Sequence, residues 1–224
     1  MAKIPSTADL KIANVGQLYE GIRAQAHAKL KKTYAQVQAS LQQIVQGMVR
    51  TEILASNTTR SLLGGKLQSD FGLESSQASS AVNKIIDYIA NNIELNLKYS
   101  YKGKDIALFT LDLLPLGIDA LTELPQGSYR SSGKYGGGDV TWLTWLLTKG
   151  TTVVIGDFWV FPNPEGSTRS GSVMQKVSRN NPDGFRVDPA FAGVADNNFV
   201  TRALSPIIPK IQDKIFKEIL EGFK

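Results

Sequence analysis

Cysteine is absent from this sequence. Its absence excludes disulfide bonds, thiol catalysis and cysteine-ligated metal sites together. Histidine occurs once, as His27, so one chain cannot build a zinc site from two or three imidazoles. A serine–histidine–acid triad would have to use His27, which lies among lysines in a strongly helical segment and is expected on the surface. Most hydrolase and metalloenzyme mechanisms are therefore excluded.

Long hydrophobic runs are absent too. No run approaches the roughly 18 residues needed to span a bilayer, and no apolar signal core follows Met1–Pro5. Synthesis in the cytoplasm is therefore expected. With 224 residues, 42% of them hydrophobic and 20% charged, the composition is that of an ordinary soluble globular protein with a sizeable core.

The net charge of +5 is unevenly distributed. Residues 1–70 contain nine Lys or Arg and four Asp or Glu, a balance of +5, whereas residues 71–224 contain sixteen of each. A basic N-terminal arm could contact nucleic acid or an acidic protein surface. A solvated helix face is the simpler interpretation.

The first 80 residues predict a helical arm and a connector. Ser6 and Asp9 resemble the start of a short helix that Gly16 interrupts. From Gln17 a helix of nearly forty residues, about 55 Å long at 1.5 Å per residue, is predicted. Its narrow apolar stripe is typical of a seam that packs on a neighbouring subunit. The stripe consists of Leu18, Ile22, Ala26, Leu30, Tyr34, Val37, Leu41, Ile44 and Met48.

Residues 56–80 are rich in Ser, Gly, Asn and Gln, which predicts a flexible connector. Three parts follow from this interpretation: an N-terminal helical arm (1–55), the connector (56–80) and an α+β domain (81–224). The α+β domain begins with a helix whose buried face carries Val82, Ile85, Ile86 and Ile89.

A β-hairpin is predicted next. Apolar and polar residues alternate from Ile93 to Tyr101, a turn follows at 102–105, and an apolar strand returns from Ile106 to Leu114. A Gly-rich loop at 125–138 precedes a short helix from Trp142, which Asp139 is expected to cap and Gly150 to end.

The last third predicts strands and a final helix. Residues 151–161 form a β-rich run in which Gly156 suggests a bulge. Short strands are expected near 173–177 and 185–187, and Ser205–Pro206 marks the start of the final helix, with Ile208, Ile211, Ile215 and Ile219 on its buried face. The predicted fold is α+β: a small, mostly antiparallel β-sheet packed by helices, with a long N-terminal helix and a C-terminal helix.

Catalytic motifs are weak. The segment Gly127–Tyr135 has five residues between its glycines instead of four, and Tyr135 stands where a P-loop needs a Ser or Thr hydroxyl. The carboxylates that could suggest two-metal chemistry fit turns, solvated faces and a sheet edge better; they are Asp105, Asp112, Asp119 and Glu123. We therefore predict no catalytic, cofactor-binding or metal-ligating residue.

Residue types that are typical of protein–protein interfaces are better represented than catalytic motifs. The loop after Phe161 is rich in glycine and hydroxyl side chains and contains Arg169, and Trp159 precedes it. Aromatic and arginine side chains together are typical of interface anchors. The candidate interface residues are Arg130, Lys134, Tyr135, Trp159, Phe161, Arg169 and Arg202. Asn197–Asn198, before Phe199, instead suits a turn and helix cap.

From Trp142 to Leu204 the order of elements forms a pattern: a tryptophan-rich helix, a long strand, a long loop, and Phe199 followed by Arg202-Ala203-Leu204 before a final helix. In this order the chain resembles the tail-completion, or head–tail joining, proteins of tailed bacteriophages, over roughly residues 93–220. The resemblance implies a homo-oligomeric ring in the virion, at the neck or tail end. Its neighbours would be neck, connector or tail-tube proteins, with transient DNA contact, no membrane and no cofactor.

The long N-terminal helix and the Gly-rich connector exceed the plain family pattern, which leaves tail-terminator and minor-tail roles open. Two other classes also remain open. One is a nucleic-acid-binding accessory protein that uses the basic residues 23–66, although that stretch contains no aromatic stacking platform. The other is an enzyme that relies on carboxylates alone, such as a cell-wall glycosidase using Asp112 or Asp157.

Overall fold

A computed structural model describes residues 7–11, 20–99, 107–112, 117–130, 138–162, 172–176 and 184–223. These residues fall into two compact units. The first unit contains the described residues of 52–88 and 116–203, and the second contains those of 7–51, 89–112 and 204–223. Helices and antiparallel strands occur in both, which confirms the α+β class, with long helices near both ends of the chain.

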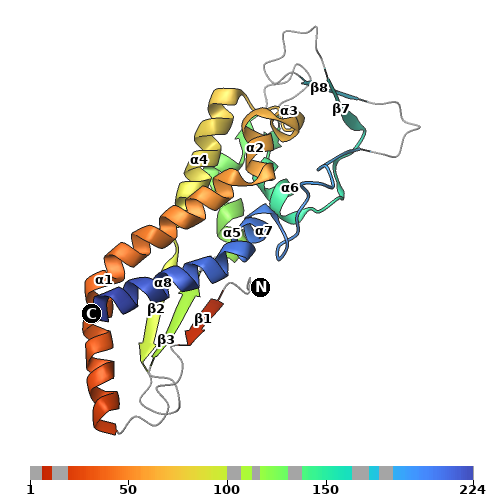
Figure 1. Ribbon diagram of the computed structural model, residues 1–224. Helices are drawn as coiled ribbons and strands as arrows, with labels where there is room; N and C mark the ends of the chain where they lie inside the picture. The colour runs from red at the N-terminus through yellow and green to blue at the C-terminus, as the bar shows by residue number, and fades with distance from the viewer. Residues whose placement is uncertain are drawn as a thin grey trace. The chain divides into compact units, whose positions relative to one another are not determined.

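The second unit is built on a three-stranded antiparallel sheet of order β1-β3-β2 (Figure 1). Strand β2 (Glu94–Tyr99) pairs with β3 (Ala107–Asp112) from Glu94 opposite Asp112 to Tyr99 opposite Ala107, so the predicted hairpin is confirmed. The turn at 102–105 lies outside the described residues.

Strand β1 (Thr7–Lys11) corrects the sequence interpretation, which placed a short helix here. It pairs antiparallel with β3 along its whole length. So short a segment gains little from helical hydrogen bonds alone, because helix nucleation is costly. Pairing with β3 instead provides hydrogen-bond partners for the backbone N–H and carbonyl groups of β1.

Helix α1 (Glu20–Ala55) is the predicted long helix, with 36 residues. It is tied to β2 because the Tyr34 hydroxyl donates a hydrogen bond of 3.1 Å to the Leu95 carbonyl. Beyond Leu41 its buried stripe follows Val45, Val49 and Ile53 in steps of four, instead of the predicted Ile44 and Met48, which are only half-buried.

His27 corrects a second expectation. It is only 5% exposed, although it was predicted on the surface of a basic helix. The residue lies three positions before buried Leu30 and therefore shares its face of α1. Neighbouring Lys31 and Lys32 are exposed, as a solvated basic face requires.

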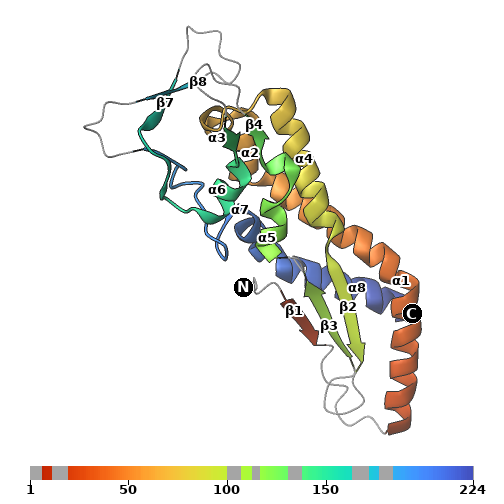
Figure 2. The same ribbon diagram turned by 180° about the vertical axis from the view of Figure 1, so that it is seen from behind.

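Helix α8 (Ile208–Phe223) completes the second unit (Figures 1 and 2). Ile211, Ile215 and Ile219 are buried as predicted, and Ile208 is half-buried. The helix contacts β1, and Thr33 of α1 donates a hydrogen bond of 3.3 Å to the Gly222 carbonyl. Ser205 does not cap a new helix, because the 3₁₀ turn η2 (Ser205–Ile207) directly follows α7 (Phe199–Leu204).

In the first unit, residues 56–80 form helices where a flexible connector was expected. They are α2 (Asn57–Gly64), α3 (Lys66–Asp70) and the start of α4 (Ser75–Asn91). Ser56 caps α2 by accepting a hydrogen bond from the Thr59 backbone N–H. The apolar residues of the segment are buried: Leu62, Leu67, Phe71 and Leu73. Val82, Ile85 and Ile86, with Ile89 where α4 continues into the second unit, form the buried face of α4, as predicted.

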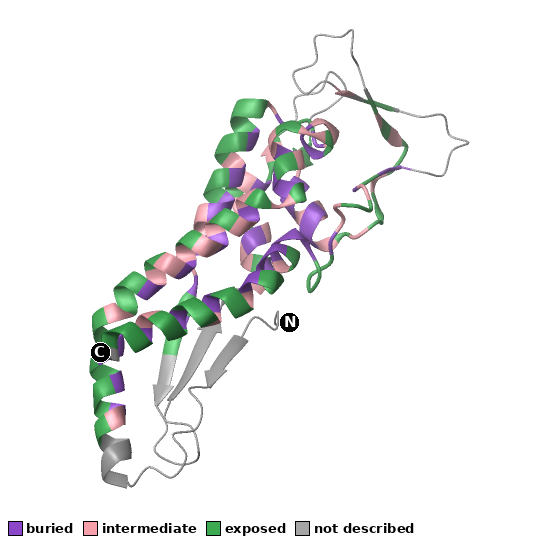
Figure 3. Cartoon of the chain, viewed as in Figure 1, coloured by how far each residue is buried: buried purple, intermediate pink, exposed green. Residues whose placement is uncertain are grey.

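The centre of the first unit is α6 (Trp142–Thr148), with buried Trp142, Leu143, Leu146 and Leu147 (Figure 3). Asp139 belongs to β5 (Asp139–Val140), which pairs with β4 (Tyr129–Arg130), so Thr141 holds the cap position predicted for Asp139. Gly150, at φ 58°, follows the helix in a conformation that favours glycine. Ahead of β4 come α5 (Gly117–Thr122) and the turn η1 (Pro125–Gly127).

The predicted single strand at 151–161 is two strands. Strand β6 (Val153–Ile155) pairs with β9 (Phe185–Arg186), and β7 (Phe158–Pro162) pairs with β8 (Ser172–Lys176). A turn at Gly156 and Asp157 separates them, with Asp157 at φ 60°. Gly156 is therefore part of a turn that sends β6 and β7 to different partners.

Candidate protein–protein interface

The β7–β8 hairpin presents two aromatic side chains to solvent. Trp159 is 38% exposed and Phe161 is 41% exposed, whereas Phe158 and Val160, which alternate with them along β7, are half-buried. Alternation along a strand therefore directs the two aromatic side chains to the open face. The register pairs Trp159 with Gln175, which is also exposed. We call this surface the hairpin face: Trp159, Phe161 and Gln175.

The hairpin is held to the rest of the first unit on its other side. The Ser172 and Ser69 hydroxyls form a hydrogen bond that joins β8 to α3. Among the described residues, β7 and β8 pair only with each other, so each strand keeps one edge without a ladder partner. Exposed aromatic residues beside open strand edges favour association with another protein chain.

Two other predicted interface residues lie in described segments. Arg130 is exposed in β4, opposite Asp139 of β5. Arg202 is engaged within the chain: its guanidinium donates hydrogen bonds of 3.2 Å to the carbonyls of Phe191 and Ala192. Arg202 therefore braces the loop before α7. Lys134, Tyr135 and Arg169 lie outside the described residues.

Asn198 performs the structural role predicted for it. Its side-chain oxygen accepts hydrogen bonds from the backbone N–H groups of Val200 and Thr201, at 3.0 and 3.2 Å, and its amide nitrogen donates to the Val194 carbonyl at 3.2 Å. The residue is fully buried. It thereby caps α7 and fixes the preceding turn.

The carboxylates considered for catalysis are not assembled into a site in the described part of the chain. Asp119, Glu123 and Asp157 are exposed. Asp105 and the side chain of Asp112 lie outside the described residues. The sheet edge expected for Asp112 is wrong, because β3 is the central strand and pairs with both β1 and β2. Within the described segments no group of three or more His, Cys, Asp or Glu side chains could hold a metal ion.

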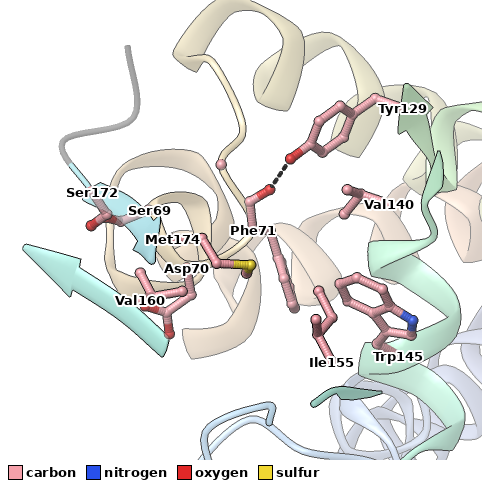
Figure 4. A pocket seen from close by; sticks show the side chains of 11 residues that line it. Ser69, Asp70, Phe71, Tyr129, Val140, Trp145, Ile155, Val160, Ser172 and Met174 are labelled. Carbon is pink, nitrogen blue, oxygen red and sulfur yellow. Dashed lines mark hydrogen bonds between the residues drawn. The ribbon is translucent and has the colours of Figure 1, made fainter. Parts of the chain in front are cut away.

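Sequence patterns did not predict a cavity of about 140 Å³ in the first unit (Figure 4). It is lined by Ser69, Asp70, Phe71, Gly72, Tyr129, Val140, Trp145, Ile155, Val160, Ser172 and Met174. Tyr129 closes one side by donating a hydrogen bond of 2.6 Å to the Phe71 carbonyl. The lining comes from separate segments of the chain, so no local spacing marks it.

A charged cluster lies next to the cavity. The Lys66 ammonium donates a hydrogen bond to the Asp188 carboxylate and lies 3.9 Å from the nearer Asp70 oxygen. Hydrogen bonds from Lys66 and from the Ala190 N–H lower the pKa of Asp188. Burial raises the pKa of Asp70, and Lys66 only partly offsets this effect.

Comparisons of the chain with protein-family models, with curated proteins and with solved structures gave no match. Among the helices of the described segments, none combines the length and the apolar character needed to cross a bilayer.

Proposed function

We propose that this chain is a structural subunit of a tailed-bacteriophage virion. It forms a ring at the head–tail junction or tail end, where it joins the connector to the tail. The observation that carries the proposal is the hairpin face, where Trp159 and Phe161 lie exposed beside strand edges without ladder partners. The order of elements from Trp142 to Leu204 resembles tail-completion proteins and supports the same role.

A second apolar patch supports a ring over a simple dimer. Phe216 and Leu220 of α8 are 39% and 47% exposed, and their spacing of four places them on one helix face. Closed rings use heterologous interfaces, in which two different surfaces of each subunit meet. The hairpin face and the α8 patch give one chain two such surfaces.

The role of this subunit is to hold neighbouring proteins in register. The other faces of the ring contact neck, connector or tail-tube proteins, and the subunit carries out no reaction. Neck, tail-terminator and minor-tail positions all remain compatible with this role.

Negative-stain electron microscopy of the purified chain tests the proposal. We expect closed rings for the wild type and isolated subunits for the Trp159→Ser, Phe161→Ser double variant. Circular dichroism must give the same helix content for both proteins, which separates loss of assembly from loss of folding. Isolated wild-type subunits at every concentration would count against a ring.

An accessory nucleic-acid-binding role is the alternative, and the exposed Lys31 and Lys32 of α1 favour it. Phosphate contacts release counterions, so such binding must weaken steeply as salt increases. Retention of duplex DNA that falls with salt and is lost in Lys31→Gln, Lys32→Gln would support this role. Equal retention by the variant would rule out these lysines as the contact.

A further inference from the structure

The cavity beside α3 has the size of a site for one side chain. At about 140 Å³ it is well below the roughly 300–1,000 Å³ of pockets that enclose drug-sized ligands. A nucleotide or an organic cofactor would not fit. A single long side chain supplied by another protein would fit the cavity.

The walls favour a ligand with an apolar stem and a flat end. Phe71, Trp145 and Met174 line the cavity drawn in Figure 4, together with the apolar side chains of Val140, Ile155 and Val160. The Trp145 ring is half-buried and Met174 is 38% exposed, so both remain accessible from outside. Aromatic faces and thioethers attract planar cations as well as apolar stems.

The negative charge of Asp70, which lines the cavity, favours a positively charged ligand. The Asp70 side chain is only 15% exposed. Its nearest cation, Lys66, gives its hydrogen bond to Asp188 and lies 3.9 Å from Asp70, beyond hydrogen-bond distance. No hydrogen bond to the Asp70 carboxylate comes from a described residue. Burial has raised the pKa of this carboxyl, which reflects the cost of a poorly paired charge.

We propose that this cavity binds an arginine side chain presented by a partner protein. The guanidinium pairs with the Asp70 carboxylate while the stem lies along Phe71, Trp145 and Met174. Arginine fits better than lysine, because its planar group stacks on an aromatic ring and can donate two parallel hydrogen bonds to one carboxylate. An anionic ligand would be repelled by the Asp70 carboxylate, whose only ion-pair partner among the described residues is Lys66 at 3.9 Å. The inference does not depend on ring formation.

A small probe tests the inference without an identified partner. Nα-acetyl-argininamide is titrated into the full-length protein while the indole N–H signals of the three tryptophans are followed by NMR. We expect saturable shifts at Trp145 and no change at Trp159. The uncharged citrulline analogue should produce no saturable shift.

Asp70→Asn should weaken binding of the probe about tenfold, since a charge-assisted hydrogen bond contributes more than 1.4 kcal/mol, the equivalent of one decade. The matched control Asp213→Asn alters an exposed carboxylate on α8 and should leave binding unchanged. Trp145→Leu provides a second variant should Asp70→Asn fail to fold; because its Trp145 signal is lost, its affinity for the probe is measured by calorimetry, and the Trp142 and Trp159 signals report folding. This variant should also bind the probe more weakly than the wild type does.

Any of four results would overturn the inference: equal binding of the citrulline analogue, unchanged affinity in Asp70→Asn, shifts that avoid Trp145, or tighter binding of free arginine than of the amide. Free arginine carries an α-ammonium and an α-carboxylate that an arginine inside a protein chain lacks, so a site for a protein side chain should bind it no more tightly than the blocked amide. Tighter binding of free arginine would assign the cavity to the amino acid and not to a protein partner. Each of these outcomes is independent of whether rings form.

Discussion

The Tyr129 hydroxyl donates a hydrogen bond of 2.6 Å to the backbone carbonyl of Phe71, which lies 58 positions earlier in the chain. Between them, Gly72 adopts φ 66°, and a Cβ at that position would lie 2.9 Å from the Tyr129 oxygen. Burial raises the pKa of Tyr129 above its ordinary value. One hydrogen bond thus joins the end of α3 to β4 and closes the cavity.

Tyr129→Phe removes only the hydroxyl and leaves the Phe71 carbonyl without this donor. We expect the free energy of unfolding to fall by about 1 kcal/mol, measured by urea denaturation. Gly72→Ala should cost more, because it combines a strained positive φ with a collision against Tyr129. Wild-type stability in Tyr129→Phe would show that the hydrogen bond contributes nothing.

Asn198→Ala should destabilise the first unit strongly. The change removes the acceptor for two backbone N–H groups at the start of α7 and buries them unpaired, at a cost of about 1–3 kcal/mol. Asn197→Ala is the matched control, because Asn197 is exposed. It should change stability by less than about 0.5 kcal/mol. Similar losses in both variants would contradict the capping role.

Asp70→Asn should change how stability depends on pH. Burial raises the Asp70 pKa in the folded state, so the folded protein binds this proton more tightly than the unfolded chain does. The resulting stabilisation is present below the unfolded pKa and is lost as pH rises through the folded pKa. The variant should therefore be at least as stable as the wild type near pH 7, and should lose this relative advantage in acid. Urea denaturation near pH 7 and in acid measures the two differences in stability. A variant that is less stable than the wild type only at neutral pH would refute the prediction.

Asp188→Asn should show the opposite dependence. Hydrogen bonds from Lys66 and the Ala190 N–H lower the folded pKa of Asp188, so its stabilisation is present above the unfolded pKa. That stabilisation disappears as pH falls through the folded pKa. Because Lys66 is 59% exposed, solvent screening limits the loss near pH 7 to about 0.2–1 kcal/mol. Equal losses at neutral and acidic pH would show that the ion pair is not the cause.

Elements with strong periodicity were predicted correctly from the sequence. The pair β2–β3 followed from strict alternation between Ile93 and Tyr101, and α8 followed from Ile211, Ile215 and Ile219. In both cases the pattern is local, so no distant residue is needed to recognise it.

Elements that depend on distant partners were predicted wrongly or missed. Strand β1 exists because it pairs with β3, about a hundred positions later in the chain. Residues 56–80 looked like a connector because they are rich in serine and glycine, although Ser56 caps α2 and the apolar residues of the segment are buried. The cavity is missed for the same reason, since Asp70, Tyr129 and Met174 meet only in the fold.

Native mass spectrometry of the wild type and of Trp159→Ser, Phe161→Ser tests the central claim most directly. Val194→Ser is the matched control, because Val194 is an apolar residue that is 45% exposed outside the hairpin. We predict one closed ring of identical subunits for the wild type and for the control, and monomers for the double variant. A wild-type monomer at all concentrations, or a ring that survives loss of both aromatic side chains, would contradict the claim that the hairpin face assembles the ring.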